Sequence, residues 1–171
     1  MSAILIGYRG SGKTTLGKRL ADSLWLKFVD TDDLIIQAAG KTIREIFEQQ
    51  GEDKFRDYET QAIRKALGLA DHIIALGGGA ITREQNRQLV KQSGIKCIFL
   101  RCEPQVLLER IQADPATAAN RPNLTGFAGG IAEVKALLEQ REPWYREVAT
   151  GELDVTWLKP EEAAIYLTRL M

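Results

Sequence analysis

The residues with the clearest chemical meaning lie near the start of the chain, where positions 7–14 read GYRGSGKT. This segment fits G-x-x-x-x-G-K-[ST], the pattern of the phosphate-binding P-loop. Its glycines allow the backbone to curl, and the N–H groups at the start of the following helix then face an anion. Lys13 can reach the β- and γ-phosphates of a nucleotide, and the Thr14 hydroxyl can ligate Mg²⁺. The residues expected to bind the phosphates are Gly10, Ser11, Gly12, Lys13, Thr14 and Thr15.

A glycine-rich turn that binds nothing is the alternative interpretation of this segment. The flanking sequence disfavours it, because an apolar strand is predicted at residues 3–6 and helically spaced leucines follow at Leu16, Leu20 and Leu24. The P-loop therefore lies between a strand end and a helix start, as its mechanism requires. It predicts a nucleoside triphosphate as ligand and leaves the chemistry that follows open.

Three aspartates, Asp30, Asp32 and Asp33, come directly after a second predicted strand at residues 27–29. In an open parallel sheet, ligands collect at the carboxyl ends of the strands, so these side chains are placed to reach a metal or a substrate. An aspartate at a helix start also satisfies free N–H groups. Both roles can hold together, with one aspartate capping the helix while another works in a site.

A run of three glycines, Gly77–Gly79, follows the third predicted strand, residues 72–76. Three glycines at a strand end offer bare N–H groups and no side chains, which suits the close approach of a ligand's oxygen atoms. The alternative is a flexible turn. A turn needs one glycine rather than three, so the sequence favours a ligand-binding segment.

Two arginines differ in what their positions predict. Arg56 lies on a predicted helix, three residues before Glu59, and the two can pair; composition alone makes Arg56 a solvated helix charge. Arg141 lies on the apolar stripe of a helix that starts at Ile131 and continues past Tyr145, so it should face inward. A buried arginine needs an anionic partner, which is either a protein carboxylate or a ligand carboxylate or phosphate.

Residues 114–130 show no clean periodicity and contain two prolines and three glycines. A loop of this length in a compact domain is usually functional or disordered. Arg121 is its only basic residue. In a phosphoryl-transfer enzyme this composition is typical of a mobile lid, here placed at about residues 112–127, that carries an arginine to the transferring phosphate.

The elements that must position these residues alternate along the chain. Strands are predicted at residues 3–6, 27–29, 72–76, 96–100 and 153–157, with helical patterns between them. This alternation predicts an α/β domain with a mostly parallel sheet. The length of 171 residues, with 44% hydrophobic and 27% charged residues, suits one domain with a substantial core.

Composition also argues against several classes of function. Lys plus Arg equals Asp plus Glu at 23 each, which argues against a nucleic-acid binder with a basic surface. No apolar run is long enough to span a bilayer, and a strand begins by residue 3, which leaves no room for a signal peptide. Cys97 and Cys102 form no CxxC pair, so reduced thiols in a cytoplasmic protein are expected. His72 has no partner at ligand spacing and is interpreted as structural.

Taken together, these motifs resemble shikimate kinase from residue 4 to about residue 149. The matching segments are the P-loop with Lys13-Thr14, Asp30-Thr31-Asp32, Phe55-Arg56-x-x-Glu59, Gly77-Gly78-Gly79, Arg121-Pro122, and Arg141 ahead of Tyr145-Arg146. The resemblance implies a three-layer P-loop kinase fold with a five-stranded parallel sheet flanked by helices and a mobile lid. It implies ATP-dependent phosphorylation of the 3-hydroxyl of shikimate, in the biosynthesis of chorismate and aromatic amino acids.

The resemblance also implies roles for individual residues at the acceptor side. Asp32 would hold the ring hydroxyls and is the candidate base. Arg56 and Arg141 would bind the shikimate carboxylate together, and the substrate-binding segment would span about residues 32–60. Gly78 and Gly79 would bind a hydroxyl through their backbone. Phe47 and Phe55 would form walls for the ring.

At the nucleotide side, the resemblance makes ATP the co-substrate and Mg²⁺ the cofactor. Thr14 would ligate Mg²⁺, with Asp30 in its outer shell. Arg110 would flank the adenine, and Arg121 would reach the phosphates from the lid. The protein would act as a monomer on a small molecule.

Two other classes remain as alternatives. Another small-molecule kinase, such as a gluconate or nucleoside-monophosphate kinase, would share the P-loop but lacks a reason for the Arg56 and Arg141 pair. A nucleotide-dependent regulatory module would need no acceptor site. A GTPase of this kind would be expected to contain an N-K-x-D motif, which this sequence does not have.

Overall fold

The structure, a computed structural model, describes residues 1–114 and 130–171. Five parallel strands form one sheet in the order β2-β3-β1-β4-β5, with the P-loop strand β1 at its centre. Leu5 of β1 pairs with Ala75 of β3 on one side and Ile98 of β4 on the other. The strands are β1 (Ala3–Ile6), β2 (Lys27–Asp30), β3 (His72–Ala75), β4 (Lys96–Arg101) and β5 (Gly151–Asp154).

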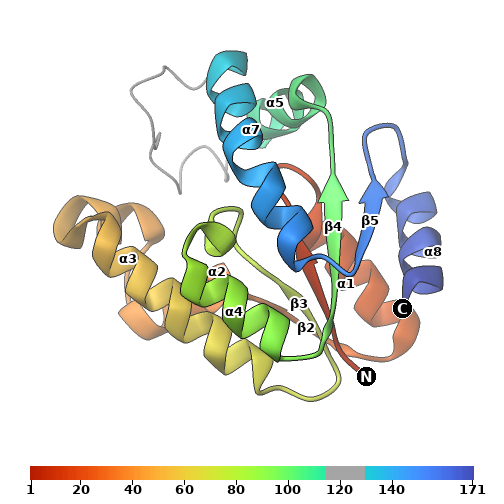
Figure 1. The fold of residues 1–171 in the computed structure, drawn as a ribbon, viewed down its shortest axis with the longest axis horizontal. Helices are drawn as coiled ribbons and strands as arrows, with labels where there is room; N and C mark the ends of the chain where they lie inside the picture. Colours follow the sequence, from red (N-terminus) through yellow and green to blue (C-terminus); the bar gives the residue numbers. More distant parts are fainter. Residues whose placement is uncertain (115–129) are drawn as a thin grey trace.

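Helices cover both faces of this sheet (Figure 1). They are α1 (Lys13–Leu24), α2 (Thr31–Ala39), α3 (Ile43–Leu67), the short 3₁₀ helix η1 (Ala80–Thr82), α4 (Glu84–Gln92), α5 (Pro104–Ala113), α7 (Ile131–Val148) and α8 (Pro160–Leu170). The predicted three-layer α/β fold with a parallel sheet is therefore confirmed.

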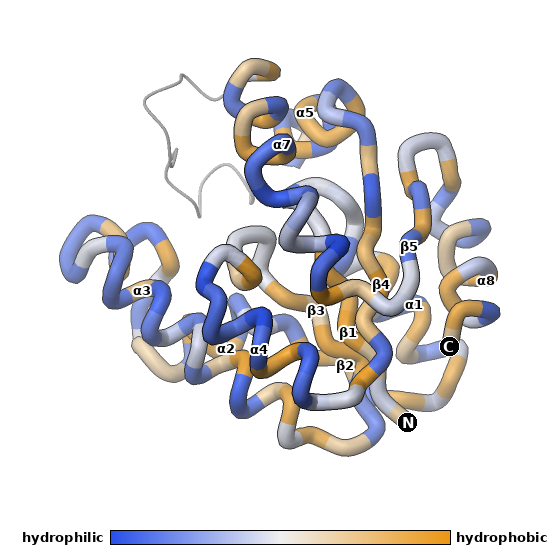
Figure 2. The backbone as a smooth tube through the Cα atoms, in the orientation of Figure 1, coloured by the Kyte–Doolittle hydropathy of each residue, from blue (hydrophilic) through white to orange (hydrophobic). Residues whose placement is uncertain are grey.

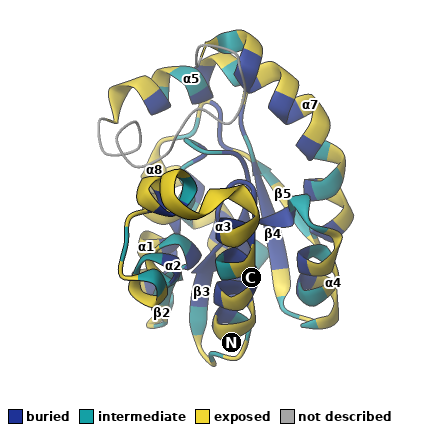
Figure 3. Ribbon diagram, turned by 90° about the vertical axis from the view of Figure 1, so that its left-hand side faces the viewer, coloured by how far each residue is buried: buried dark blue, intermediate teal, exposed yellow. Residues whose placement is uncertain are grey.

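The central strand shows how the sequence builds the two layers. All four residues of β1 are apolar and buried, because helices lie on both sides of the strand. Leu5 packs in one core cluster with residues of α1 and α8, whereas Ile4 and Ile6 pack in a second cluster with residues of α3, α4 and α7. The central strands of the sheet are mainly hydrophobic in Figure 2 and mainly buried in Figure 3, whereas the edge strands β2 and β5 are partly exposed. Full burial of one Leu or Ile side chain stabilises the folded state by about 1.5–3 kcal/mol.

The helical segment from α2 to the first half of α3 has a small core of its own. Ile35, Ile46 and Phe55 are among its buried residues. The start of α3 is fixed by a capping box between Thr42 and Glu45. Gly51 then interrupts the helix with φ 81° and ψ 172°, so α3 is kinked there.

The last strand was predicted too late in the chain, because β5 spans Gly151–Asp154 rather than residues 153–157. Gly151 pairs with Ile98, which sets the earlier register. Asp154 Oδ1 then accepts hydrogen bonds from the backbone N–H and the hydroxyl of Thr156, and this side-chain turn ends the strand. The predicted lid with Arg121 lies almost wholly outside the described residues. Of the helices described, none combines the length and the apolarity needed to cross a membrane.

Candidate active site

The P-loop connects β1 to α1 in the conformation that its glycines allow. Gly10 and Gly12 have φ of 83° and 89°, values that a side chain would strain. The start of α1 has no side-chain cap among the described residues, so its first N–H groups are available to an anion. Lys13 Nζ donates to the carbonyl oxygens of Gly7 at 2.8 Å and Tyr8 at 2.9 Å. The ammonium group therefore lies over the loop that is expected to hold phosphates.

Asp30 joins the P-loop to the start of α2. Its Oδ1 accepts from the backbone N–H of Asp32 at 3.0 Å, which caps α2, and its Oδ2 accepts from the Thr14 hydroxyl at 2.8 Å. The sequence left open whether an aspartate here caps the helix or works in the site. Asp30 caps the helix and at the same time contacts the P-loop threonine.

Burial raises the pKa of the Asp30 carboxyl group above its ordinary value, and the nearby Asp32 carboxylate raises it further. The hydrogen bonds from Asp32 N–H and Thr14, and the charge of Lys13, act in the opposite direction. A cation beside Asp30 would relieve both unfavourable effects. The oxygen donors of Thr14 and Asp30 are the kind that Mg²⁺ prefers, so these residues fit that ion.

The part of the chain that is described holds no group of three or more His, Cys, Asp or Glu side chains arranged to bind a metal. Mg²⁺ keeps several waters and is usually bound by one or two protein groups together with substrate phosphates, a role that the oxygens of Thr14 and Asp30 fit.

A cavity lies beside the P-loop, between α3, α7 and the glycine run. Two of its arginines, Arg56 and Arg141, are only 6% and 7% exposed. Phe47 and Phe55 lie against each other on its wall, with ring centroids 4.6 Å apart. The lining residues are Tyr8, Arg9, Phe47, Phe55, Arg56, Gly78, Gly79, Glu133, Leu137 and Arg141. We refer to this space as the acceptor cavity.

Arg56 is held by acidic side chains on its own helix. Its Nη1 donates to Glu59 Oε2 at 2.9 Å and to the carbonyl of Gly79 at 3.3 Å, which confirms the predicted pairing with Glu59. Glu52 Oε1 accepts from Nη2 at 3.0 Å and from Nε at 3.3 Å. The Glu52 side chain is 57% exposed, whereas that of Glu59 is 1% exposed. Composition alone predicted that Arg56 is exposed to solvent. This prediction was wrong, because the segment around Gly79 covers the face of α3 that carries Arg56.

The glycine run is a tightly bonded turn. The N–H of Gly77 donates to the Thr31 hydroxyl at 3.0 Å, so this N–H is not bare as the sequence suggested. No acceptor for the N–H groups of Gly78 and Gly79 occurs among the described residues. A Cβ on Gly79 would lie 2.7 Å from Arg56 Nη1, so a side chain at this position would displace the guanidinium. Gly78 and Gly79 thus remain suited to bind a ligand oxygen.

Arg141 faces inward, as its place on the apolar stripe of α7 predicted. Its Nη1 contacts the carbonyl of Gly78 at 3.4 Å, and its guanidinium lies 5.8 Å from the centroid of the Tyr8 ring. Nε is buried and has no hydrogen-bond partner within the described residues. None of the ion pairs formed between described residues involves Arg141. Its anionic partner is therefore not a carboxylate of the described chain.

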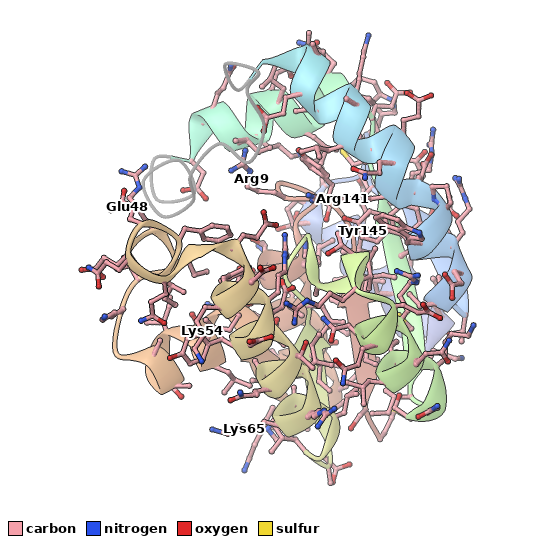
Figure 4. The ribbon with its side chains drawn as sticks, turned by 60° about the vertical axis from the view of Figure 1, so that its left-hand side comes forward. Arg9, Glu48, Lys54, Lys65, Arg141 and Tyr145 are labelled. Atoms are coloured by element: carbon pink, nitrogen blue, oxygen red, sulfur yellow. The ribbon has the colours of Figure 1, made fainter. Side chains whose placement is uncertain are left out.

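Tyr145, one turn beyond Arg141, was not assigned a role from the sequence. It is fully buried, its hydroxyl donates to the carbonyl of Gly78 at 2.5 Å, and its ring stacks on Phe99 with centroids 4.9 Å apart. Figure 4 shows Tyr145 and Arg141 together on α7. The position of Tyr145 on the inward stripe of α7 could have indicated that its side chain is buried. Its hydrogen-bond partner lies 67 residues away, so residue spacing could not predict that contact.

A larger, more open cavity surrounds the P-loop and the start of α1. Its wall includes Asp30, Asp32, Arg110 and every P-loop residue expected to bind phosphates. Arg110 is held against the segment after β5, because its Nη2 donates to the carbonyls of Val155 at 3.0 Å and Thr156 at 3.3 Å. We refer to this space as the nucleotide cavity. It shares Arg9 and Gly78 with the acceptor cavity, so the two cavities adjoin.

The predicted site residues thus divide between two adjoining cavities. Asp32, the candidate base, lies in the wall of the nucleotide cavity, which Gly77 and Gly78 also line. Arg121 lies outside the described residues. Sequence reasoning missed Tyr8, Glu133 and Leu137; the last two stand eight and four residues before Arg141, a helical spacing that could have indicated them.

A parallel sheet with a P-loop after its central strand, and an acceptor cavity beside the loop, defines a P-loop kinase of small molecules. Comparison with known proteins narrows this class. The sequence model of the shikimate kinase family matches residues 9–171. A shikimate kinase of Rhodopirellula baltica is 44% identical over 92% of this chain and 83% of that relative, and one of Caldanaerobacter subterraneus is 38% identical over 94% and 90%. The chain belongs to the shikimate kinase family.

Solved structures agree with this assignment. A shikimate kinase of Acinetobacter baumannii, determined in complex with shikimate, has a TM-score of 0.90 and 33% identity, with 99% of this chain and 91% of that chain covered. A gluconokinase of Sinorhizobium meliloti has a TM-score of 0.62 and 21% identity, with coverage of 99% and 93%. The gluconokinase shows a shared fold alone. The family predicted from the motifs is confirmed.

Proposed function

We propose that this protein transfers the γ-phosphoryl group of ATP to the 3-hydroxyl of shikimate, within the biosynthesis of aromatic amino acids, and that its two adjoining cavities hold the two substrates. Membership of the shikimate kinase family gives the reaction. The observation that supports the assignment of the cavities is the pair of buried guanidinium groups, Arg56 and Arg141, in a cavity next to the P-loop. Phosphoryl transfer depends mainly on positioning and charge neutralisation, which both cavities offer.

In the acceptor cavity, Arg56 and Arg141 bind the shikimate carboxylate. The Arg56 fork that Glu52 now occupies, Nε and Nη2, has the geometry for a bidentate carboxylate, and the buried Nε of Arg141 supplies a further donor. Gly78 and Gly79 bind a ring hydroxyl through their N–H groups. Phe47 and Phe55 contact the face of the ring and exclude water from it. The segment of residues 32–60 contributes Phe47, Phe55 and Arg56 to the lining of this cavity.

In the nucleotide cavity, Gly10, Ser11, Gly12 and Thr15 hold the phosphates with the start of α1, and Arg110 flanks the adenine. Lys13 leaves the carbonyls of Gly7 and Tyr8 for the phosphates, whose charge is the stronger attraction. Thr14 would hold Mg²⁺, and Asp30 would orient that threonine through their hydrogen bond. When bound, Mg²⁺ neutralises phosphate charge as ATP reacts.

For the transfer itself, Asp32 accepts or orients the proton of the attacking hydroxyl. It lines the nucleotide cavity together with Gly78, which also borders the acceptor cavity. Arg121, on a lid at about residues 112–127, would add a cation to the transferring phosphate. We further propose that the protein acts as a monomer in the cytoplasm and binds no nucleic acid, since its formal net charge is zero.

Acceptor-dependent ADP release tests this proposal. The protein is incubated with MgATP and shikimate, with gluconate, a nucleoside monophosphate or no acceptor as controls. Release that requires shikimate supports the reaction, and ³¹P NMR of the product identifies the phosphorylated hydroxyl. Release with another acceptor would retain the P-loop argument and contradict the carboxylate-binding role of Arg56 and Arg141.

A further inference from the structure

The P-loop of this protein carries a second cation, Arg9, to which sequence reasoning assigned no role. Arg9 lines both the acceptor cavity and the nucleotide cavity, a position that it shares with Gly78. Figure 4 shows Arg9 in the region between α7 and the first half of α3, with Arg141 beside it. A side chain that borders both cavities can reach a group that passes from one to the other.

The backbone of Arg9 is fixed on both sides. A Cβ on Gly78 would lie 3.1 Å from Arg9 N, so the glycine run packs directly against the P-loop at this point. On the other side, Gly10 holds its positive φ of 83° and packs against α5, since a Cβ there would lie 3.0 Å from Ile111. Arg9 therefore extends from a rigid loop, which is the condition for a precisely placed cation.

The charge of Arg9 is not neutralised within the described part of the chain. None of the ion pairs found there involves Arg9, in contrast to Arg56, which contacts both Glu52 and Glu59. Arg9 and Arg141 both lower the pKa of the Tyr8 phenol, against the larger effect of burial, which raises it. Two arginines therefore place positive charge near Tyr8, and the carboxylate of Glu133 opposes it in part.

We propose that Arg9 contacts the transferring phosphoryl group: the γ-phosphate while it belongs to ATP, and the 3-phosphate once it belongs to the product. The assignment rests on the proposed function. In the reaction, the 3-oxygen of shikimate forms a bond to the γ-phosphorus and the bond from that phosphorus to the bridging oxygen of ADP breaks. The hydroxyl proton leaves to Asp32 or to solvent, and Arg9 exchanges neither protons nor electrons. It stabilises the equatorial oxygens by charge-assisted hydrogen bonds.

The test compares Arg9→Met and Arg9→Lys with a matched surface variant, Arg64→Met, whose arginine is exposed on α3. For each variant, kcat is measured, and the Kd values of shikimate and of shikimate 3-phosphate are measured by calorimetry in the presence of ADP. For Arg9→Met we expect the Kd of shikimate 3-phosphate to rise about tenfold or more, because hydrogen bonds to charged groups contribute on that scale. The Kd of shikimate should stay within about twofold, and kcat should fall. Arg9→Lys should recover part of both losses, and Arg64→Met should match wild type.

Two results would overturn the assignment. An equal loss of affinity for shikimate and for shikimate 3-phosphate would place Arg9 on the body of the acceptor. Unchanged product affinity with a lower melting temperature would make Arg9 structural. Failure of the proposed function looks different, because it would appear in the wild-type protein as the absence of shikimate-dependent ADP release.

Discussion

Replacing Tyr145 by Phe should loosen the turn that borders the acceptor cavity. The Tyr145 hydroxyl donates to the carbonyl of Gly78 at 2.5 Å, and the ring stacks on Phe99 in the core. Phe retains the ring and its stacking and removes the hydroxyl alone. Of the hydrogen bonds to this carbonyl from described residues, the longer one from Arg141, at 3.4 Å, then remains.

The size of the effect follows from the burial of this contact. A protein hydrogen bond contributes about 0.5–1.5 kcal/mol net, and an unsatisfied buried acceptor costs about 1–3 kcal/mol. Because Arg141 partly satisfies Gly78, we expect the free energy of unfolding to fall by about 1–2 kcal/mol. For a chain of this length, that corresponds to a decrease in melting temperature of about 2–8 °C. Since Gly78 and Arg141 both border the cavity, the Kd of shikimate should rise by up to about tenfold.

Urea unfolding measures the first quantity and calorimetric titration with shikimate the second. Tyr166→Phe is the matched control, because Tyr166 lies on α8 with 46% of its surface exposed and should tolerate loss of the hydroxyl. A Tyr145→Phe variant with wild-type unfolding free energy and wild-type shikimate affinity would refute the reasoning. A loss of stability without any change in affinity would separate Tyr145 from the site and leave it a core residue.

Further predictions concern three other side chains. Asp32→Asn should lower kcat about 100-fold or more, the scale of a lost general base; unchanged steady-state turnover would remove Asp32 from the mechanism. Glu52→Gln should tighten shikimate binding about two- to fivefold, because a partly exposed carboxylate no longer competes for Arg56; calorimetry should show no such gain for Glu48→Gln. Burial raises the pKa of the Cys97 thiol from 9.0 to about 12. As pH rises, this thiol therefore ionises in the unfolded protein before it ionises in the folded protein. The stability that it contributes is therefore full below about pH 9 and lost as pH rises toward 12, and urea unfolding of wild type and Cys97→Ala should converge across that range.

Much of the site could be predicted from the sequence, because the features concerned depend only on residues a few positions apart. The P-loop glycines, the capping by Asp30 and the inward face of Arg141 each follow from one turn of helix or one loop. The burial of Arg56 does not. It depends on Gly79, which lies 23 residues away and packs its backbone against the guanidinium.

The bounds of the last strand were also set by contacts between distant residues rather than by the local sequence pattern. Residues 153–157 have a better apolar pattern than 151–154, yet the pairing of Gly151 with Ile98 and the side-chain turn of Asp154 decide the boundaries. Residue propensity predicted that a strand exists here, but its register is determined by pairing with β4. Tyr145 is a third case, since its hydrogen bond to Gly78 depends on how α7 lies over the glycine run.

The strand register explains why three separate segments form one site. Ala75 of β3 pairs with Leu5 of β1 on one side and with Asp30 of β2 on the other. The segments that follow these strands, namely the P-loop, the glycine run and the aspartates, therefore leave the sheet next to one another at its carboxyl edge. Each segment could be recognised from the sequence, but their contact depends on β3 inserting between β2 and β1. A change that shifted the register of β3 by one residue would separate Gly78 from Arg9, and Gly77 from Thr31, even with every site residue intact.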